Sequence, residues 1–113
     1  MHIKVVKKTD KAFRITFPDT VTITGWLFYF TAKKKVTIPD DDAVISFEWS
    51  EHTGPQETVL SLPREMTDIE PGDYYYDILI KDDSGKVKPL KFGADDPPYP
   101  MKVTKTVTDR RPE

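Results

Sequence analysis

The 113-residue chain contains no cysteine, only two histidines and only five glycines. The lack of cysteine excludes disulfides, thiolate zinc sites and thiol nucleophiles together. His2 and His52 have no serine or aspartate partner in a recognisable motif, so a nucleophilic triad has little support. The glycines form neither a GxGxxG nor a GxxxxGK sequence, which excludes the usual phosphate-binding loops. We therefore expect no enzyme and no cofactor.

Long apolar runs and a strong charge of one sign are also missing. No apolar stretch approaches the roughly 18 to 20 residues of a membrane-spanning helix. The 17 basic and 19 acidic residues leave a net charge of -2, which does not favour a nucleic-acid partner. The start, MHIKVVKKTD, has no apolar segment of the kind found in signal peptides. We expect a protein with no membrane or nucleic-acid partner and no signal peptide.

Acidic and basic runs are present, but they are short. The acidic runs are Asp40–Asp42, Asp82–Asp83 and Asp95–Asp96, and none has the spacing of a known calcium loop. Most acidic turns are simply solvated, so we expect no metal site. The lysines at 33–35 form the one notable basic cluster in the interior of the chain. They are interpreted as guarding an exposed sheet edge or as contacting an acidic neighbour.

The residues that are plentiful indicate β-strands. Ten prolines and the few glycines separate short runs rich in Val, Ile, Thr, Phe and Tyr, and no helix is convincing. The strand pattern predicts an all-β antiparallel sandwich of about seven to nine strands, forming one domain over 1–109 with a short polar tail at 110–113. The expected strands are 2–7, 11–17, 25–34, 43–50, 57–63, 74–81, 86–93 and 101–108, with a short extended piece at 20–24.

The expected strand at 25–34 is apolar on both faces. Alternation places Trp26, Phe28, Phe30 and Ala32 on one face, and Leu27, Tyr29, Thr31 and Lys33 on the other. A strand with two apolar faces lies inside a sheet or beneath a neighbouring subunit. Leu27 and Tyr29 are therefore candidate interface residues.

Three consecutive tyrosines follow a corner in the segment DIEPGDYYY. Tyr74 comes two residues after Gly72, which is the layout of the tyrosine corner of immunoglobulin-like sandwiches, where the hydroxyl bonds to the main chain upstream. Tyr76 would occupy the inward site that holds a cysteine in antibody domains, and Trp26 would pack across from it as the core tryptophan. Tyr75 points the other way. The alternative is that all three tyrosines are surface strand formers.

Aromatic residues outside the corner have several interpretations. Tyr75, Trp49 and Tyr99 join Leu27 and Tyr29 as possible interface residues, because their expected faces are exposed, ambiguous or in loops. Exposed aromatics serve as protein interfaces or sugar platforms, and burial in the core is the alternative for each.

Four segments in order resemble a known family: ITGWLFYFTAKK, IPDDDAVISFEW, TVLSLPREMTDIEPGDYYYDILIKDDSGKVKPLKFG and KVTKTV. They are similar to the immunoglobulin-like domain at the N-terminus of phage baseplate upper proteins and related tail proteins, over about residues 20–109. The shared progression is a Gly-aromatic strand ending in lysines, an acidic loop, an apolar strand, the D-I-x-P-G-x-Y-Y-Y-D-I corner, a D-x-x-G-x-V hairpin and a closing strand.

The resemblance implies a non-enzymatic structural protein of a phage or prophage. Such a domain attaches larger tail or baseplate proteins to the virion, so we expect other virion proteins as partners, a homo-oligomer, and synthesis in the bacterial host cytoplasm followed by incorporation into virions. Family members usually continue into helices or a receptor-binding part, which leaves open a stand-alone component, a prophage remnant or a domain with an unrelated role. The rival hypothesis is a carbohydrate-binding or adhesion module of the same fold, using exposed aromatics.

Overall fold

A computed structural model describes residues 2–92 and 96–105, and most of its regular structure is β-strand. The elements in chain order are β1 (Ile3–Val6), β2 (Lys11–Thr16), β3 (Leu27–Lys33), the single 3-10 turn η1 (Asp40–Asp42), β4 (Ile45–Trp49), β5 (Glu57–Leu62), the one-turn helix α1 (Arg64–Thr67), β6 (Gly72–Lys81), β7 (Val87–Pro89) and β8 (Tyr99–Thr104).

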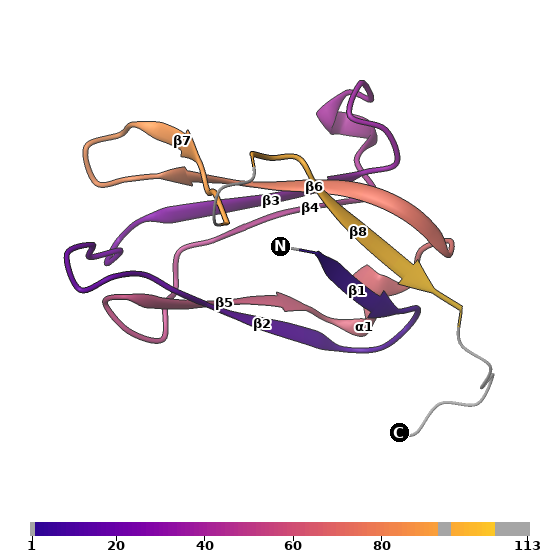
Figure 1. Cartoon of the computed structure of the whole chain (residues 1–113), viewed down its shortest axis with the longest axis horizontal. Helices are drawn as coiled ribbons and strands as arrows, with labels where there is room; N and C mark the ends of the chain where they lie inside the picture. Colours follow the sequence, from indigo (N-terminus) through magenta and orange to yellow (C-terminus); the bar gives the residue numbers. More distant parts are fainter. Residues whose placement is uncertain (1, 93–95, 106–113) are drawn as a thin grey trace.

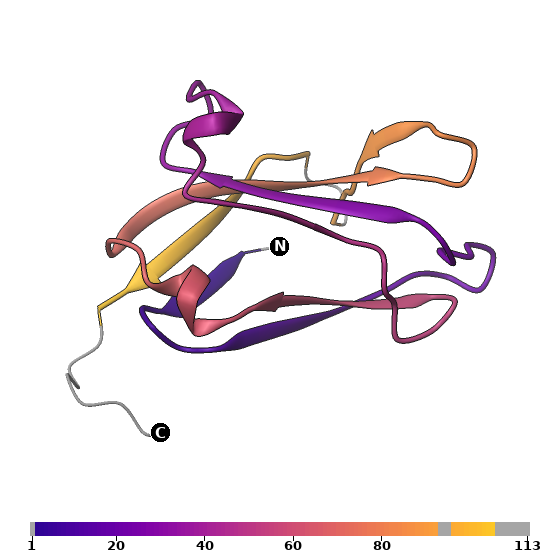
Figure 2. The same cartoon turned by 180° about the vertical axis from the view of Figure 1, so that it is seen from behind.

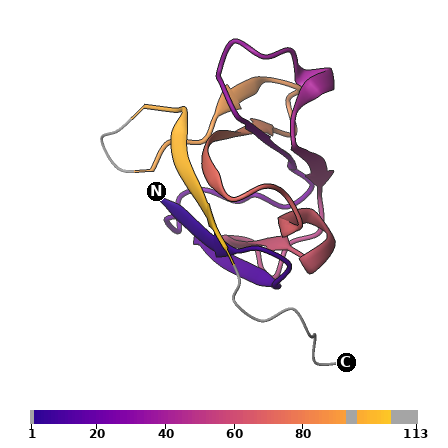
Figure 3. The same cartoon turned by 90° about the vertical axis from the view of Figure 1, so that its right-hand side faces the viewer.

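The strands form two sheets that pack face to face. The larger sheet has the order β1-β8-β6-β3-β4, with β7 pairing with the far end of β6, and the smaller sheet contains β2 and β5. Figure 1 shows β3, β4 and β6 as one layer above β2 and β5. The end-on view shows β8 running down from the upper layer with β1 beside it, which closes one side of the sandwich (Figure 3).

This division of strands is that of an immunoglobulin-like sandwich. One sheet of such a domain carries strands B and E, here β2 and β5, and the other carries C, F and G, here β3, β6 and β8. The expected all-β sandwich is confirmed, but it is not wholly antiparallel, because β1 pairs with β8 in parallel. Parallel pairing requires the two ends of the chain to meet, which no local pattern signals.

The core lies between the sheets and follows from alternation along each strand. On β3 the buried positions are Phe28, Phe30 and Ala32, and on β6 they are Tyr74, Tyr76, Ile78 and Ile80. The remaining buried hydrophobic residues are Ile3, Val5, Ile15, Ile23, Ile45, Leu60, Leu62, Leu90, Tyr99, Met101 and Val103. Phe30 stacks on Tyr76 with ring centroids 5.4 Å apart, which joins two adjacent strands at the centre of this core.

Several expected element boundaries are wrong. The piece at 20–24 forms no strand, because residues 21–23 lie between two turns, one closed by the bond from Val21 N–H to Pro18 O and the other by that from Trp26 N–H to Ile23 O. The strand expected at 25–34 therefore begins at Leu27. The strand expected at 86–93 is reduced to the three residues of β7. Positions 106–108 of the last strand, and the tail at 110–113, lie outside the described residues.

The expectation of no helix overlooks the single turn α1. Its first backbone N–H, that of Arg64, donates to the Asp10 carboxylate at 2.7 Å, so a side chain from the β1–β2 connection satisfies the helix start. Thr67, at the end of the turn, is fully buried and donates its hydroxyl to Thr9 O at 2.7 Å. One turn is too short to show a helical period in the sequence, and its stabilising contacts come from residues more than fifty positions away.

Candidate interaction surface

The outer face of the larger sheet, meaning the side turned away from β2 and β5, is the surface with the clearest potential for binding. Along β3 its side chains are Leu27, Tyr29, Thr31 and Lys33, all partly exposed. The β3–β6 register places Tyr29 opposite Leu79, Thr31 opposite Asp77 and Lys33 opposite Tyr75. β3 lies inside the sheet, between β6 and β4, as its two apolar faces suggested. No other described strand covers the outer face.

Two segments rise beside this face and make it concave. One is the connection from β3 to β4, which contains η1, and the other is the β6–β7 hairpin; both project above the upper layer in Figure 1. Val36 of the first segment lines a hollow of about 190 Å³ together with Tyr75. Val87 of the hairpin lines a second hollow, of about 570 Å³. Thr31 and Leu79 line both hollows, so the two lie side by side and are together called the depression.

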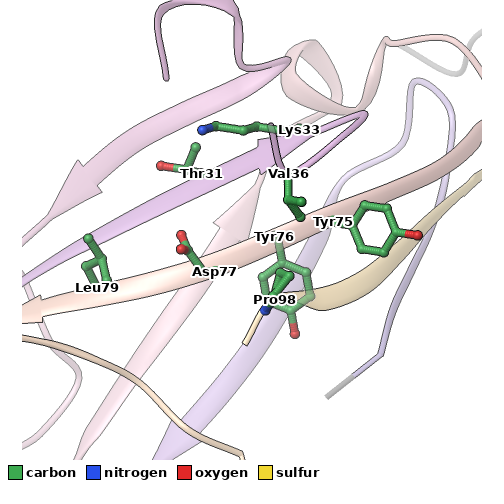
Figure 4. Close-up of a pocket in the computed structure, with 8 residues that line it drawn as sticks. All are labelled: Thr31, Lys33, Val36, Tyr75, Tyr76, Asp77, Leu79 and Pro98. Carbon is green, nitrogen blue, oxygen red and sulfur yellow. The ribbon is translucent and has the colours of Figure 1, made fainter. Parts of the chain in front are cut away.

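The floor of the depression mixes apolar and polar groups. Figure 4 shows Thr31, Lys33 and Asp77 beside one another over β3 and β6, while the Tyr76 ring points to the opposite side of its strand. Tyr75 is 44% exposed, Val36 56% and Val87 57%. These three are among the five large hydrophobic side chains that are exposed in the described part of the chain. Their gathering on one concave face distinguishes it from an ordinary solvated sheet surface.

The lysine cluster does not guard an edge. Lys33 is the last residue of the internal strand β3, and Lys34 and Lys35 are exposed in the following connection. The expected role fails because β4 pairs with β3 and becomes the edge itself. The connection returns through η1, so its lysines and aspartates lie in one short segment.

The tyrosine corner has the geometry its sequence suggested. Tyr74 is buried, and its hydroxyl donates to the carbonyl oxygen of Glu70 at 2.5 Å. Gly72, between them, has φ of +151°, a conformation that L side chains rarely adopt. Burial, followed by the charge of Glu70, raises the pKa of Tyr74. Tyr76 is 1% exposed, and burial raises its pKa also, with a smaller contribution from Tyr99.

Trp26 does not act as the core tryptophan across from Tyr76. It lies just before β3 and is partly buried, with the Lys88 ammonium 5.1 Å from its ring centre. Phe30 is the residue that stacks on Tyr76. The register explains the error: Phe28 pairs with Ile80, so Trp26 lies beyond the end of β6, far along the strand from Tyr76.

Two other expected interface residues point inward. Tyr99 begins β8 and is 3% exposed, and its hydroxyl accepts a hydrogen bond from Phe92 N–H at 2.9 Å. Trp49 shares the inward face of β4 with Ile45 and Phe47, and it is half-buried. Leu27, Tyr29 and Tyr75 are thus the expected interface residues that lie on the outer face, while Val36 and Val87 were missed because isolated valines in loops and short strands carry no signal.

A polar network around His52, only partly buried, was also missed from the sequence. The Trp49 indole N–H donates to Thr58 Oγ1 at 2.8 Å, and Thr58 Oγ1 lies 2.9 Å from His52 Nδ1. His52 Nε2 lies 2.8 Å from the carbonyl oxygen of Trp26. Since a carbonyl only accepts, Nε2 carries a proton, and in the neutral ring Nδ1 then accepts from the Thr58 hydroxyl. The network ties β4, β5 and the start of β3 together, which is a structural role.

The acidic turn at Asp82 is held by its own hydrogen bonds. Asp82 Oδ1 accepts from the Ser84 hydroxyl at 2.6 Å and from the N–H groups of Ser84 and Lys86, both at 3.0 Å. These bonds, that of the Ser84 hydroxyl above all, lower the pKa of Asp82. Within residues 2–92 and 96–105 no three His, Cys, Asp or Glu side chains are grouped so as to hold a metal ion. Asp95 lies outside the described residues.

Within the same part of the chain, no helix has the length and apolar character needed to cross a membrane. Comparison of the chain with models of protein families finds no match, and comparison with curated proteins finds none either. The interpretation of the outer face therefore depends on its geometry and chemistry.

Proposed function

We propose that the chain is a non-enzymatic structural module of a phage or prophage virion. In this proposal it is an attachment domain of the tail or baseplate type that joins other virion proteins through the outer face of its larger sheet. It is made in the bacterial host cytoplasm and ends in the assembled particle. The virion role rests on the resemblance of residues 20–109 to phage tail domains. The docking face rests on the placement of Val36, Tyr75 and Val87, each more than two-fifths exposed, on one concave face.

The chemistry of this face suits a protein partner. Protein interfaces typically have an apolar, aromatic centre and a polar rim. Here Tyr29 and Leu79 form an apolar pair at the centre of the sheet, and Glu48 and Lys81 lie beside them. Large apolar side chains are exposed on this face in the isolated chain. Their burial by a partner would stabilise the complex.

Carbohydrate binding is the alternative use of the same face. In its favour, Tyr29 and Tyr75 both belong to it, and aromatic rings beside polar groups are typical of sugar platforms. The tryptophans, however, contribute little to such a platform. Lys88 lies over the ring of Trp26, and the indole N–H of Trp49 is bonded within the protein.

The test compares incorporation of variants into particles. The gene is replaced by V36D/V87D or by V6D in the strain that carries it, virions are induced and purified, and peptides of the chain are quantified by mass spectrometry. Val6 is a matched control, because it is 41% exposed but lies on β1, two strands away from β6 at the end of the larger sheet, and lines neither hollow. Two buried charges should prevent docking, so V36D/V87D is expected to be depleted at least tenfold while V6D matches wild type.

Two results would overturn the proposal: absence of the wild-type chain from purified virions, or equal incorporation of V36D/V87D. Binding of the pure protein to a glycan array, lost in Y75A, would favour the carbohydrate alternative. Circular dichroism of each purified variant verifies that the sandwich is intact.

A further inference from the structure

The free edge of β4 is a second surface, distinct from the outer face. Among the strands that the structure describes, β4 ends the larger sheet and pairs with β3 alone. Seen from behind, β4 runs along the near side of the molecule with no other ribbon in front of it (Figure 2). An edge strand presents backbone N–H and C=O groups that can pair with another strand.

The sequence of β4, ISFEW, lacks the features that usually protect an edge. It contains no proline, no lysine and no arginine, and Glu48 is its single charge. At the opposite end of the same sheet, β1 carries the exposed Lys4. The edge of the smaller sheet formed by β2 carries the exposed Lys11 and Arg14. β4 is thus the least protected of these three edge strands.

The inward side chains of β4 also remain incompletely buried. Phe47 and Trp49 are only partly buried, and their rings pack together with centroids 5.6 Å apart. On β5, which is also an edge, the inward residues Thr58, Leu60 and Leu62 are all fully buried, so β5 has no comparable apolar area to cover. A strand added beside β4 would cover the two aromatic rings while pairing the backbone.

The sequence of β4 is complementary to itself when two copies run antiparallel about Phe47. Directly opposite residues in an antiparallel pair point to the same face of the sheet. With Phe47 opposite its equivalent, Ile45 lies opposite Trp49 on the inward face, and Ser46 lies opposite Glu48 on the outward face. All five positions then pair and no like charges meet. A shift of register that centres the pair on Glu48 instead places two carboxylates in contact.

We propose that two copies of the chain pair through their β4 edges, antiparallel and centred on Phe47, so that the two larger sheets become one continuous sheet across a two-fold axis. This pairing goes beyond the attachment role and does not depend on it, because it uses only a second copy of the chain. Its test uses the pure protein, so either proposal can fail while the other stands.

Charge placed at Ser46 tests both the pairing and its register. In the proposed dimer this position faces the partner's Glu48 twice, once on each side of the axis. S46E therefore places two pairs of like charges opposite one another and is expected to weaken dimerisation about fivefold to thirtyfold. S46K instead creates two attractive pairs and is expected to strengthen dimerisation. Ser46 is exposed, so neither variant disturbs the core. Sedimentation equilibrium from micromolar to about 1 mM protein measures the dimer dissociation constant.

A disulfide experiment reads the register directly, since the chain has no cysteine of its own. Opposite residues have Cα atoms about 4.5 to 5.5 Å apart, within reach of a disulfide, whereas diagonal ones are about 7 to 8 Å apart. Mild oxidation of mixed S46C and E48C proteins is therefore expected to give the S46C–E48C product, with little of either self-product.

The proposal is overturned if the wild-type chain stays monomeric at about 1 mM, or if S46E and S46K shift the dissociation constant in the same direction. It is overturned equally if S46C links mainly to itself, because that product requires another register or another surface.

Discussion

Replacement of Thr58 by valine should destabilise the fold far more than the change in shape suggests. Valine has the size of threonine but no hydroxyl, so the substitution leaves no cavity. Thr58 is fully buried, and its Oγ1 is the hydrogen-bond partner of both the Trp49 indole N–H and His52 Nδ1. The variant therefore leaves two polar atoms without their partner.

The size of the effect follows from those two atoms. A buried polar group that loses its partner destabilises a protein by about 1 to 3 kcal/mol. Trp49 and His52 are only partly buried, so the cost for each should lie in the lower part of that range. We therefore expect T58V to lower the free energy of unfolding by about 2 to 4 kcal/mol. Small domains are stable by about 5 to 15 kcal/mol in total, so this loss should lower the midpoint of urea unfolding by roughly 1 to 3 M.

Equilibrium unfolding in urea, followed by tryptophan fluorescence and by circular dichroism, measures the change. T58S is the matched control, because it keeps the hydroxyl and loses only a methyl group, worth about 1 kcal/mol. In a W49F background the indole donor is already gone, so T58V should cost about half as much there. If T58V were as stable as T58S, the network would contribute nothing and the reasoning would be refuted.

Three further predictions concern the corner and the β6–β7 hairpin. Y74F, which removes the hydroxyl that closes the corner, should lower the free energy of unfolding by about 1 kcal/mol in urea titrations, whereas Y75F should leave it within experimental error because that ring is exposed. Hydrogen bonds within the turn lower the pKa of Asp82, so the ionised carboxylate stabilises the hairpin above about pH 3.8, and this stability is lost as pH falls through the lowered pKa. Amide exchange in the hairpin should show the loss, and D82N should remove the pH dependence. G85A should destabilise by about 1 to 2 kcal/mol, since φ there is +86°, while G54A, where φ is not positive and a Cβ meets nothing within 4 Å, should not; equal thermal midpoints for the two would contradict this.

The proposed docking face was predictable only in part. Alternation along 25–34 and 74–81 identified Leu27, Tyr29 and Tyr75 as the side chains opposite the core, because the period of a strand is a local property. Val36 and Val87, which make the face concave, come from segments more than fifty residues apart. Only the rise of the β3–β4 connection and the β6–β7 hairpin on the same side of the sheet brings them to one depression.

The error at Trp26 has a related cause. Gly25 followed by aromatics reads as the start of a strand, but Gly25 has φ of +81° and belongs to a turn. The strand begins two residues later, and the register with β6 then places Phe30, not Trp26, against Tyr76. A pattern of alternation fixes which residues share a face, but it does not fix which residue of the next strand each one meets.

By itself the sequence determined where most of the strands lie, which of their faces are buried, the Gly-containing hairpin and the corner at Tyr74, because each depends on residues within a few positions of one another. Only the tertiary structure decided that β4 is an edge, that β1 and β8 run in parallel, and that Trp49, Thr58 and His52 share one network. These features arise from pairing between distant segments. Such pairing is selected by the packing free energy of the whole sandwich, and no short stretch of the chain contains that information.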